Sequence, residues 1–346
     1  MKHRPASRPR NFSRFLSRAV FALAAARAAA ATTDIRLGTV LPDRTPQHQL
    51  LVELAAQWQK ESAGTVKLIV HAGGVMGDES AMVRKMKHGQ LAAGLLTSNG
   101  LAEIDPAVTG LMFMPLIYRS WAEVDYVREK MRPLLESRLR AQGYEVLFWA
   151  DAGWIRFFSK TAAFRPEDFR PMKLFAWVGD ERQVALMKSI GFWPVPLEST
   201  NIPLGLGTGM IAAAPVPPLA ALGGQIYRAA PHMLDLKWCP IVGATVVRTD
   251  LWEKIPAALR MKLAAAATPV GEKMRARGRT DDGAFIAAME KNGLQVHAVP
   301  ADALPQWEKL ATDVYPKIRG NMVPAEIFDA VQQHLRDFRA ANPATP

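Results

Sequence analysis

One apolar stripe, running from Pro256 to Lys291, constrains the fold more than any other feature of this sequence. Its side chains recur every three or four residues, as on one face of a helix: Leu259, Leu263, Ala266, Val270, Met274, Phe285 and Met289. A helix of about 36 residues is about 54 Å long by its rise per residue. That length exceeds one small domain, so we expect the helix to run across two lobes. Gly278 and Gly283 predict a bend within it.

The rest of the chain alternates short apolar runs with amphipathic segments and short loops. The predicted strands lie at 35–41, 66–70, 92–96, 146–150, 157–159, 173–177, 210–214, 241–247 and 294–298. The predicted helices lie at 46–61, 79–88, 121–141, 166–169 and 180–190, with one more ending near 209 and others running to 339. Such alternation predicts α/β layers with a largely parallel sheet. Because proline cannot donate to a ladder, we expect Pro215 to end the 210–214 strand.

The net charge of +11 first suggests a nucleic-acid-binding protein. Seven of the basic residues and no acidic residue lie within 1–31, which leaves 36 basic and 32 acidic residues in the remainder. A remainder of +4 without a dense Lys/Arg block argues against nucleic-acid binding. No run of 18 apolar residues occurs, so we expect no transmembrane helix.

The basic N-terminal segment has the three parts of a secretory signal peptide. The run from Lys2 to Arg18 is basic, residues 19–26 are apolar, and small residues follow at 28–31. We therefore predict that residues 1–31 are removed on export to the periplasm. A mitochondrial-type presequence or a disordered basic tail is the alternative. The C-terminal residues 341–346 are predicted to be disordered.

The residue types that carry catalysis are missing at useful spacings. No two of the seven histidines lie three or four apart, so we expect no metal site. The sequence holds neither a Gly-x-Ser-x-Gly elbow nor a P-loop. Cys239 is the one cysteine, and we expect it to pack in the core rather than to act as a nucleophile. The chain is therefore predicted not to be an enzyme and to need no cofactor.

Several short motifs, in order, resemble the extracytoplasmic solute-binding subunits of TRAP transporters, the DctP-like family. The resemblance covers about residues 34–338. It is carried by Ile35-Arg36-Leu37-Gly38, Gly77-Asp78-Glu79, Met112-Phe113-Met114-Pro115, Phe164-Arg165-Pro166-Glu167-Asp168-Phe169, Gly191-Phe192-Trp193-Pro194-Val195-Pro196-Leu197 and Gly207-Thr208-Gly209-Met210-Ile211-Ala212. Each match is short, and the resemblance rests on the motifs occurring in the same order and at similar spacing as in the family.

The resemblance implies a two-lobed periplasmic-binding-protein fold of type II-like architecture, with mixed sheets flanked by helices and a long helix spanning both lobes. We expect residues 34–150 and 242–284 in lobe I and residues 151–241 and 285–340 in lobe II. The implied function is capture of a small organic ligand by hinge closure and its delivery to a TRAP membrane permease. The chain looks closer to a branch of the family that works with a tetratricopeptide-repeat periplasmic protein.

Three departures from the family pattern concern the ligand. Phe175 stands where the family has an Arg in a Lys-Ile-Arg strand, and Ile155 aligns with a second family Arg. Ala212 or Ala213 replaces the Asp of the Gly-x-x-Asp motif. Arg suits carboxylates because its rigid fork donates two parallel hydrogen bonds, and neither Phe nor Ile can do so.

We therefore predict a more apolar ligand than an ordinary dicarboxylate, such as a monocarboxylate or a lipid-like molecule. The predicted wall of the second lobe comprises Trp154, Ile155, Phe175, Trp177, Pro215 and Pro217. The first lobe is expected to contribute Met76, Asn99 and Phe113.

Other interpretations of the same residues remain open. Phe175 and Trp177 share one face of their strand, so both can pack in the core of the lobe instead. A dicarboxylate or keto-acid receptor is possible if Arg156, Arg182 or Lys173 supplies charge from a shifted position. A periplasmic sensor or scaffold with a vestigial cleft is a third alternative.

Overall fold

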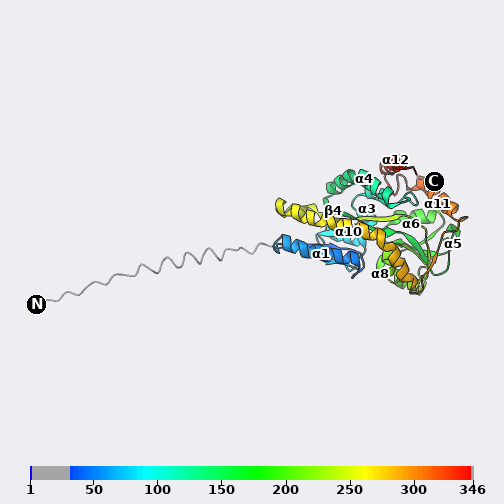
Figure 1. The fold of residues 1–346 in the computed structure, drawn as a ribbon, viewed down its shortest axis with the longest axis horizontal. Helices are drawn as coiled ribbons and strands as arrows, with labels where there is room; N and C mark the ends of the chain where they lie inside the picture. Colours follow the sequence, from blue (N-terminus) through cyan, green and yellow to red (C-terminus); the bar gives the residue numbers. More distant parts are fainter. Residues whose placement is uncertain (2–31, 344–346) are drawn as a thin grey trace.

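The computed structural model describes Met1 and residues 32–343. The predicted signal peptide therefore lies outside the described residues apart from Met1, as do residues 344–346 of the predicted tail. Two mixed sheets, each flanked by helices, form the α/β fold that the resemblance implied (Figure 1). The prediction of a largely parallel sheet was wrong, because each sheet contains antiparallel neighbours.

The first sheet has five strands in the order β2-β1-β3-β10-β4. They are β1 (Thr33–Gly38), β2 (Val66–His71), β3 (Ala93–Thr97), β4 (Tyr144–Trp154) and β10 (Pro240–Arg248). β1 runs parallel to β2 and β3, and β10 runs antiparallel to β3 and β4. The carboxyl ends of β1 and β3 thus lie together at one edge of the sheet.

Helices cover both faces of this sheet, and we call the whole assembly the first lobe. One core packs α1 and the long helix α10 (Ala257–Glu290) against the sheet, and another packs α2, α4 and α12 on the opposite side. The bounds are α1 (Pro46–Glu61), α2 (Glu79–Lys87), α3 (Ser98–Ala102), η1 (Pro106–Leu111), α4 (Trp121–Ala141), α9 (Thr249–Trp252) and α12 (Ala325–Ala341).

The second sheet has six strands in the order β11-β9-β5-β8-β6-β7. They are β5 (Arg156–Ser159), β6 (Lys173–Trp177), β7 (Trp193–Leu197), β8 (Ala213–Val216), β9 (His232–Leu234) and β11 (Gln295–His297). With its helices this sheet forms the second lobe. The helices are α5 (Pro166–Phe169), α6 (Glu181–Ser189), η2 (Ser199–Asn201), α7 (Ile202–Thr208), α8 (Pro218–Gly223), η3 (Ile226–Arg228) and α11 (Leu304–Ile318).

The expectation that Pro215 ends its strand was wrong. β8 lies between β5 and β6 and includes Pro215, which pairs with Phe157 of β5. The parallel ladder from β6 reaches β8 only at Ala213, so no bond to β6 requires an N–H at position 215. A central strand can therefore accommodate this proline.

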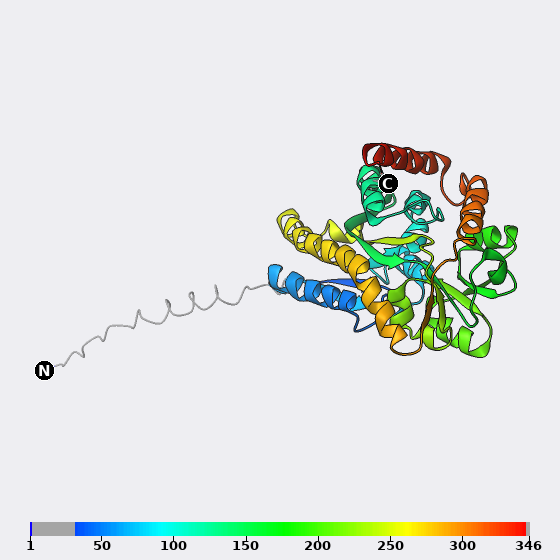
Figure 2. The same ribbon diagram turned by 45° about the vertical axis from the view of Figure 1, so that its right-hand side comes forward.

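Helix α10 (Ala257–Glu290) joins the two lobes, as its length predicted. Its first part packs beside α1 on the first sheet, whereas Met289 belongs to a core of the second lobe. Figure 2 shows the helix changing direction between these two parts. Ile155 and the segment before β10 cross the junction together, since the Ile155 N–H donates to the carbonyl of Cys239 at 2.9 Å.

A buried ionic cluster fixes α10 beside this crossing. Arg279 of α10 donates to Asp151 of β4 at 2.6 Å and to Asp125 of α4 at 2.7 Å. Arg128 of α4 donates to Asp151 from the other side at 2.9 Å. Asp151 and Arg128 are both almost fully buried, so each charge depends on the others for compensation. The cluster links one helix from each face of the sheet through the strand between them.

The predicted lobe boundaries stay a prediction, with one observation that bears on them. Helix α12 packs against α4, and its Val331 and Leu335 belong to a core of the first lobe. The prediction placed residues 285–340 in lobe II. In the structure α11 packs on the second lobe through Trp307, while α12 returns to the first.

Candidate functional site

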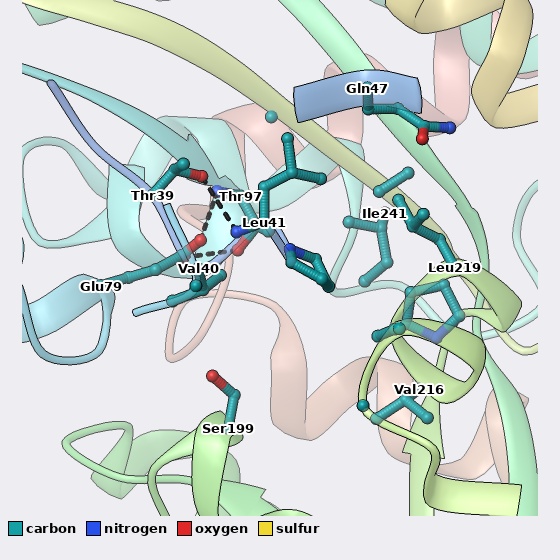
Figure 3. A pocket seen from close by; sticks show the side chains of 18 of the residues that line it. Thr39, Val40, Leu41, Gln47, Glu79, Thr97, Ser199, Val216, Leu219 and Ile241 are labelled. Carbon is teal, nitrogen blue, oxygen red and sulfur yellow. Dashed lines mark hydrogen bonds between the residues drawn. The ribbon is translucent and has the colours of Figure 1, made fainter. Parts of the chain in front are cut away.

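A cavity of about 430 Å³ lies between the two lobes (Figure 3). The first lobe contributes residues that follow β1 and end β3, together with the start of α1. The second lobe contributes Trp177, the segment before α7, and α8. Its lining is mostly apolar: Val40, Leu41, Pro42, Leu95, Leu96, Trp177, Ile202, Pro203, Val216, Pro217, Leu219, Ala220, Ile226 and Ile241. The volume is in the range of small-molecule sites.

Glu79 anchors the first-lobe wall of this cavity. Its carboxylate accepts hydrogen bonds from the Thr97 N–H at 2.8 Å, the Thr97 hydroxyl at 2.6 Å and the Gly100 N–H at 2.8 Å. Burial raises the pKa of Glu79 to about 7, against the opposing effect of these bonds. The carboxylate therefore holds the end of β3 and the start of α3 in place, and its acceptor capacity is used within the protein.

A second, smaller cavity of about 100 Å³ lies on the other side of Trp177. It is lined by Phe113, Ile155, Phe175 and Pro215, among other apolar residues. Trp177 lines both cavities, and its ring lies edge-on to Phe175 with centroids 5.4 Å apart. Cys239 also lines the smaller cavity, and burial raises the pKa of its thiol to about 12, in keeping with the expected packing role.

The structure divides the predicted ligand wall between these two cavities. Trp177 and Pro217 line the larger one, and Phe113, Ile155, Phe175, Trp177 and Pro215 line the smaller one. The remaining three line neither: Met76, Asn99 and Trp154. Trp154 is buried against Trp121, with ring centroids 5.0 Å apart. Whether the nine residues bind a ligand stays a prediction.

The two positions where the family has arginines are apolar and enclosed. Phe175 is 1% exposed and belongs to a core of the second lobe, while it also borders the smaller cavity. Both interpretations of Phe175, as core and as wall, therefore describe part of its environment.

The three basic residues considered as substitutes lie outside both cavities. Arg156 is buried and donates to Asp235 at 2.5 Å. The ammonium of Lys173 lies over the ring of Trp193, and Arg182 is exposed. Neither lining includes a lysine, arginine or histidine, whereas Asp43, Glu79 and Asp151 border the larger cavity. No basic group is therefore available there to neutralise a carboxylate.

A polar clasp between Asp78 and Ser199 joins the two lobes beside the larger cavity, which Ser199 lines. Asp78 caps α2 by accepting from the Glu79 N–H at 2.9 Å. Its other oxygen accepts from the N–H of Ser199, in the second lobe, at 3.1 Å. Burial raises the pKa of Asp78 while these bonds oppose the rise. One carboxylate thus both begins a helix in the first lobe and holds the second lobe against it.

Sequence reasoning missed most of the first-lobe wall. The segment Thr39–Asp43 follows β1 and Leu95–Thr97 ends β3, and these are carboxyl ends of parallel strands. Ligands of α/β proteins commonly bind at such ends, so the predicted strands at 35–41 and 92–96 already contained this signal. Gln47 was missed as well, because a polar residue at the start of a helix normally faces solvent.

Other kinds of site receive no support. Within residues 32–343, no group of three or more His, Cys, Asp and Glu side chains is placed to hold a metal ion. No helix of the described chain is long and apolar enough to cross a membrane.

Comparison with known proteins agrees with this architecture. Residues 37–321 match the model of the family DctP, described as bacterial extracellular solute-binding protein, family 7. The 2,3-diketo-L-gulonate-binding periplasmic protein YiaO of Escherichia coli (strain K12) is 21% identical over 271 residues, covering 77% of this chain and 81% of its own. The C4-dicarboxylate-binding periplasmic protein DctP of Rhodobacter capsulatus is 20% identical over 303 residues, covering 86% and 90%.

A solved structure shows the same fold. DctP7 of Bordetella pertussis, an extracytoplasmic solute receptor binding pyroglutamic acid, superposes with a TM-score of 0.80 at 17% identity. The match covers 88% of this chain and all of that one.

Proposed function

This chain belongs to the DctP family of bacterial extracellular solute-binding proteins, and from that membership we propose that it captures a largely apolar organic ligand between its lobes. The family membership makes it a solute-binding receptor of TRAP type. The ligand class is the proposed part.

One observation carries the proposal: the larger interlobe cavity is mostly apolar and no basic side chain lines it. Burying an anion there without a partner would cost several kcal/mol. Burying ~300 Å² of apolar ligand surface instead contributes ~7 kcal/mol before the costs of association. The balance supports micromolar binding when the cavity is preformed.

Hinge motion of the lobes would change the width of this interlobe space. The lobes are connected by the crossing at Ile155, by the segment before β10, by α10 and by the segment between α11 and α12, so they can rotate about these links. A ligand that contacts both walls favours the closed arrangement over the open one.

Binding measurements with native and chosen ligands test the proposal. Native mass spectrometry of the protein from its own periplasm should reveal a co-purifying organic molecule. Ala220→Leu, which fills the larger cavity from α8, should weaken its binding at least tenfold. Ala287→Leu on the exposed face of α10 is the matched control and should leave binding unchanged. Equal binding by both variants would place the ligand elsewhere.

A small-carboxylate receptor is the second candidate, because the named relatives bind a dicarboxylate, a sugar acid derivative or pyroglutamic acid. Titration with succinate, keto acids and fatty acids separates the two. Tight binding of a small dicarboxylate that is abolished by Arg156→Ala would overturn the apolar-ligand proposal.

The partners and location follow the family. The curated relatives are periplasmic binding proteins, and we place this chain in the same compartment, delivering its ligand to a membrane permease without a catalytic step. A tetratricopeptide-repeat partner remains part of the proposal. Co-purification of a permease with the tagged protein would support transport, whereas a repeat protein alone would favour the sensor or scaffold alternative.

A further inference from the structure

Gln47, the second residue of α1, has an unusual position for an amide. Its side chain is 3% exposed, and neither Nε2 nor Oε1 has a hydrogen-bond partner among the described residues. The residue lines the larger cavity, as Figure 3 shows. Buried polar groups in native proteins are nearly always hydrogen-bonded, so an amide with two unpartnered ends requires an explanation.

The fold itself does not explain the amide. Thr45 caps α1 by accepting from the His48 N–H, and Pro46 occupies the first turn, so Gln47 has no capping role. An unbranched apolar side chain such as Met would fill nearly the same volume without an unpaired donor and acceptor. On stability alone, Gln is therefore a poor choice at this position.

The other buried polar groups that line the cavity are already engaged within the protein. The Thr39 hydroxyl accepts from the Leu41 N–H at 3.1 Å, Glu79 accepts from Thr97 and Gly100, and Asp151 binds Arg128 and Arg279. Gln47 is the one buried side chain in this lining whose polar atoms all lack a partner among the described residues.

The charges around the cavity select the type of group that Gln47 can meet. The lining holds no lysine, arginine or histidine, so an anionic head would be buried there without a cationic partner. A primary amide offers one donor and one acceptor side by side, which matches another amide in a paired, two-bond arrangement. We propose that Gln47 is a specificity-determining residue that recognises the carboxamide-like head of a neutral, otherwise apolar ligand. This inference rests on the proposed function of the cavity.

Calorimetry with chain-matched probes tests the inference on the full mature protein. Octanamide carries the donor and the acceptor, 2-nonanone keeps only the acceptor, and octanoate carries a negative charge. At neutral pH we expect octanamide to bind about tenfold more tightly than either of the others.

Variants of Gln47 separate recognition from folding. Gln47→Met should weaken octanamide binding more than tenfold, because two bonds are lost, weaken 2-nonanone binding less, because one bond is lost, and raise the melting temperature of the free protein. Gln49→Met, on the exposed face of the same helix, should change none of the three. Gln47→Asn keeps an amide but withdraws it by one methylene, and it should weaken octanamide binding without the gain in stability.

The possible outcomes are distinct. If octanamide and 2-nonanone bind equally and Gln47→Met affects neither, the amide recognition is overturned while the apolar cavity stands. Tighter binding of octanoate than of octanamide also overturns it. If no probe binds and a small dicarboxylate does, the proposed function fails and the inference fails with it.

Discussion

Phe175 shows how much, and how little, one residue can tell about a site. Its place in the motif predicts a departure from the family pattern, because an aromatic ring cannot hold a carboxylate. The structure then adds what the motif could not, since Phe175 is buried in a core and borders only the smaller cavity. Which cavity the ring borders depends on how the strands and helices pack, and a strand motif alone does not predict that packing.

Asp282 is the residue for which we predict a pH effect. It lies on α10 against Gly153 and accepts weakly from the Trp154 N–H at 3.4 Å. Burial raises its pKa from 3.8 to about 6, while Arg156 and Lys237 oppose this rise and Asp235 adds to it. Since the folded pKa exceeds the unfolded one, this group's contribution to stability is complete below about pH 4 and is lost as the pH rises through about 6.

Asp282→Asn should therefore remove the part of the pH dependence of the free energy of unfolding that arises from this carboxyl group. The difference between wild type and variant in the free energy of unfolding should change by up to about 3 kcal/mol between pH 4 and pH 7. Urea denaturation at several pH values measures it. Parallel pH profiles for the two proteins would show that Asp282 does not titrate as described.

Among the secondary-structure elements, the bounds of α10 were predicted well, whereas its contacts with β4 were not. Its apolar period gave the helix to within a residue at either end, and the two glycines pointed to a bend. The sequence does not distinguish those glycines, yet the structure does. A Cβ on Gly278 would lie 2.3 Å from the Asp151 carbonyl oxygen, whereas Gly283 faces open space.

Alanine substitutions at these two glycines should have opposite effects. Gly283→Ala should stabilise the protein by up to about 1 kcal/mol, because alanine favours the helix. Gly278→Ala should destabilise it by about 1–3 kcal/mol, because the backbone of β4 cannot yield to the added methyl group. Chemical denaturation of both variants measures the difference. Stabilisation by both would mean that α10 does not pack tightly on β4.

For the whole molecule, the sequence supplied the class, the two lobes and the lobe-spanning helix. These depend on periodicity, which is local, and on motif order. It did not supply the return of α12 to the first lobe, or the position of the larger cavity between Thr39 and Leu219, since both depend on contacts between distant segments. The burial of the Gln47 amide without a hydrogen-bond partner could not be predicted either, because it also depends on contacts between distant segments.

Closure of the lobes should depend on the clasp between Asp78 and Ser199. Ser199→Pro removes the donor N–H at the first position of η2, where proline is tolerated, and leaves the capping role of Asp78 intact. Ser199→Ala keeps the N–H and removes only the longer bond from the Ser199 hydroxyl to Asp78 at 3.4 Å, so comparison of the two variants isolates the N–H. The proline variant should weaken ligand binding about fivefold and enlarge the radius of gyration of the free protein in X-ray scattering. Identical scattering and affinity for both variants would assign no role in closure to the clasp.

The burial of Arg128 and Asp151, at the centre of the ionic cluster beside α10, has a consequence for where such a receptor can work. At moderate salt, dissolved ions largely screen the interaction between exposed charges that lie more than about 10 Å apart. The interaction within a buried ion pair is screened much less. A receptor outside the cytoplasmic membrane meets whatever salinity its surroundings impose. Because dissolved ions scarcely reach the pair of Arg128 and Asp151, and no lysine, arginine or histidine lines the cavity, we expect ligand binding to change little between fresh and brackish water.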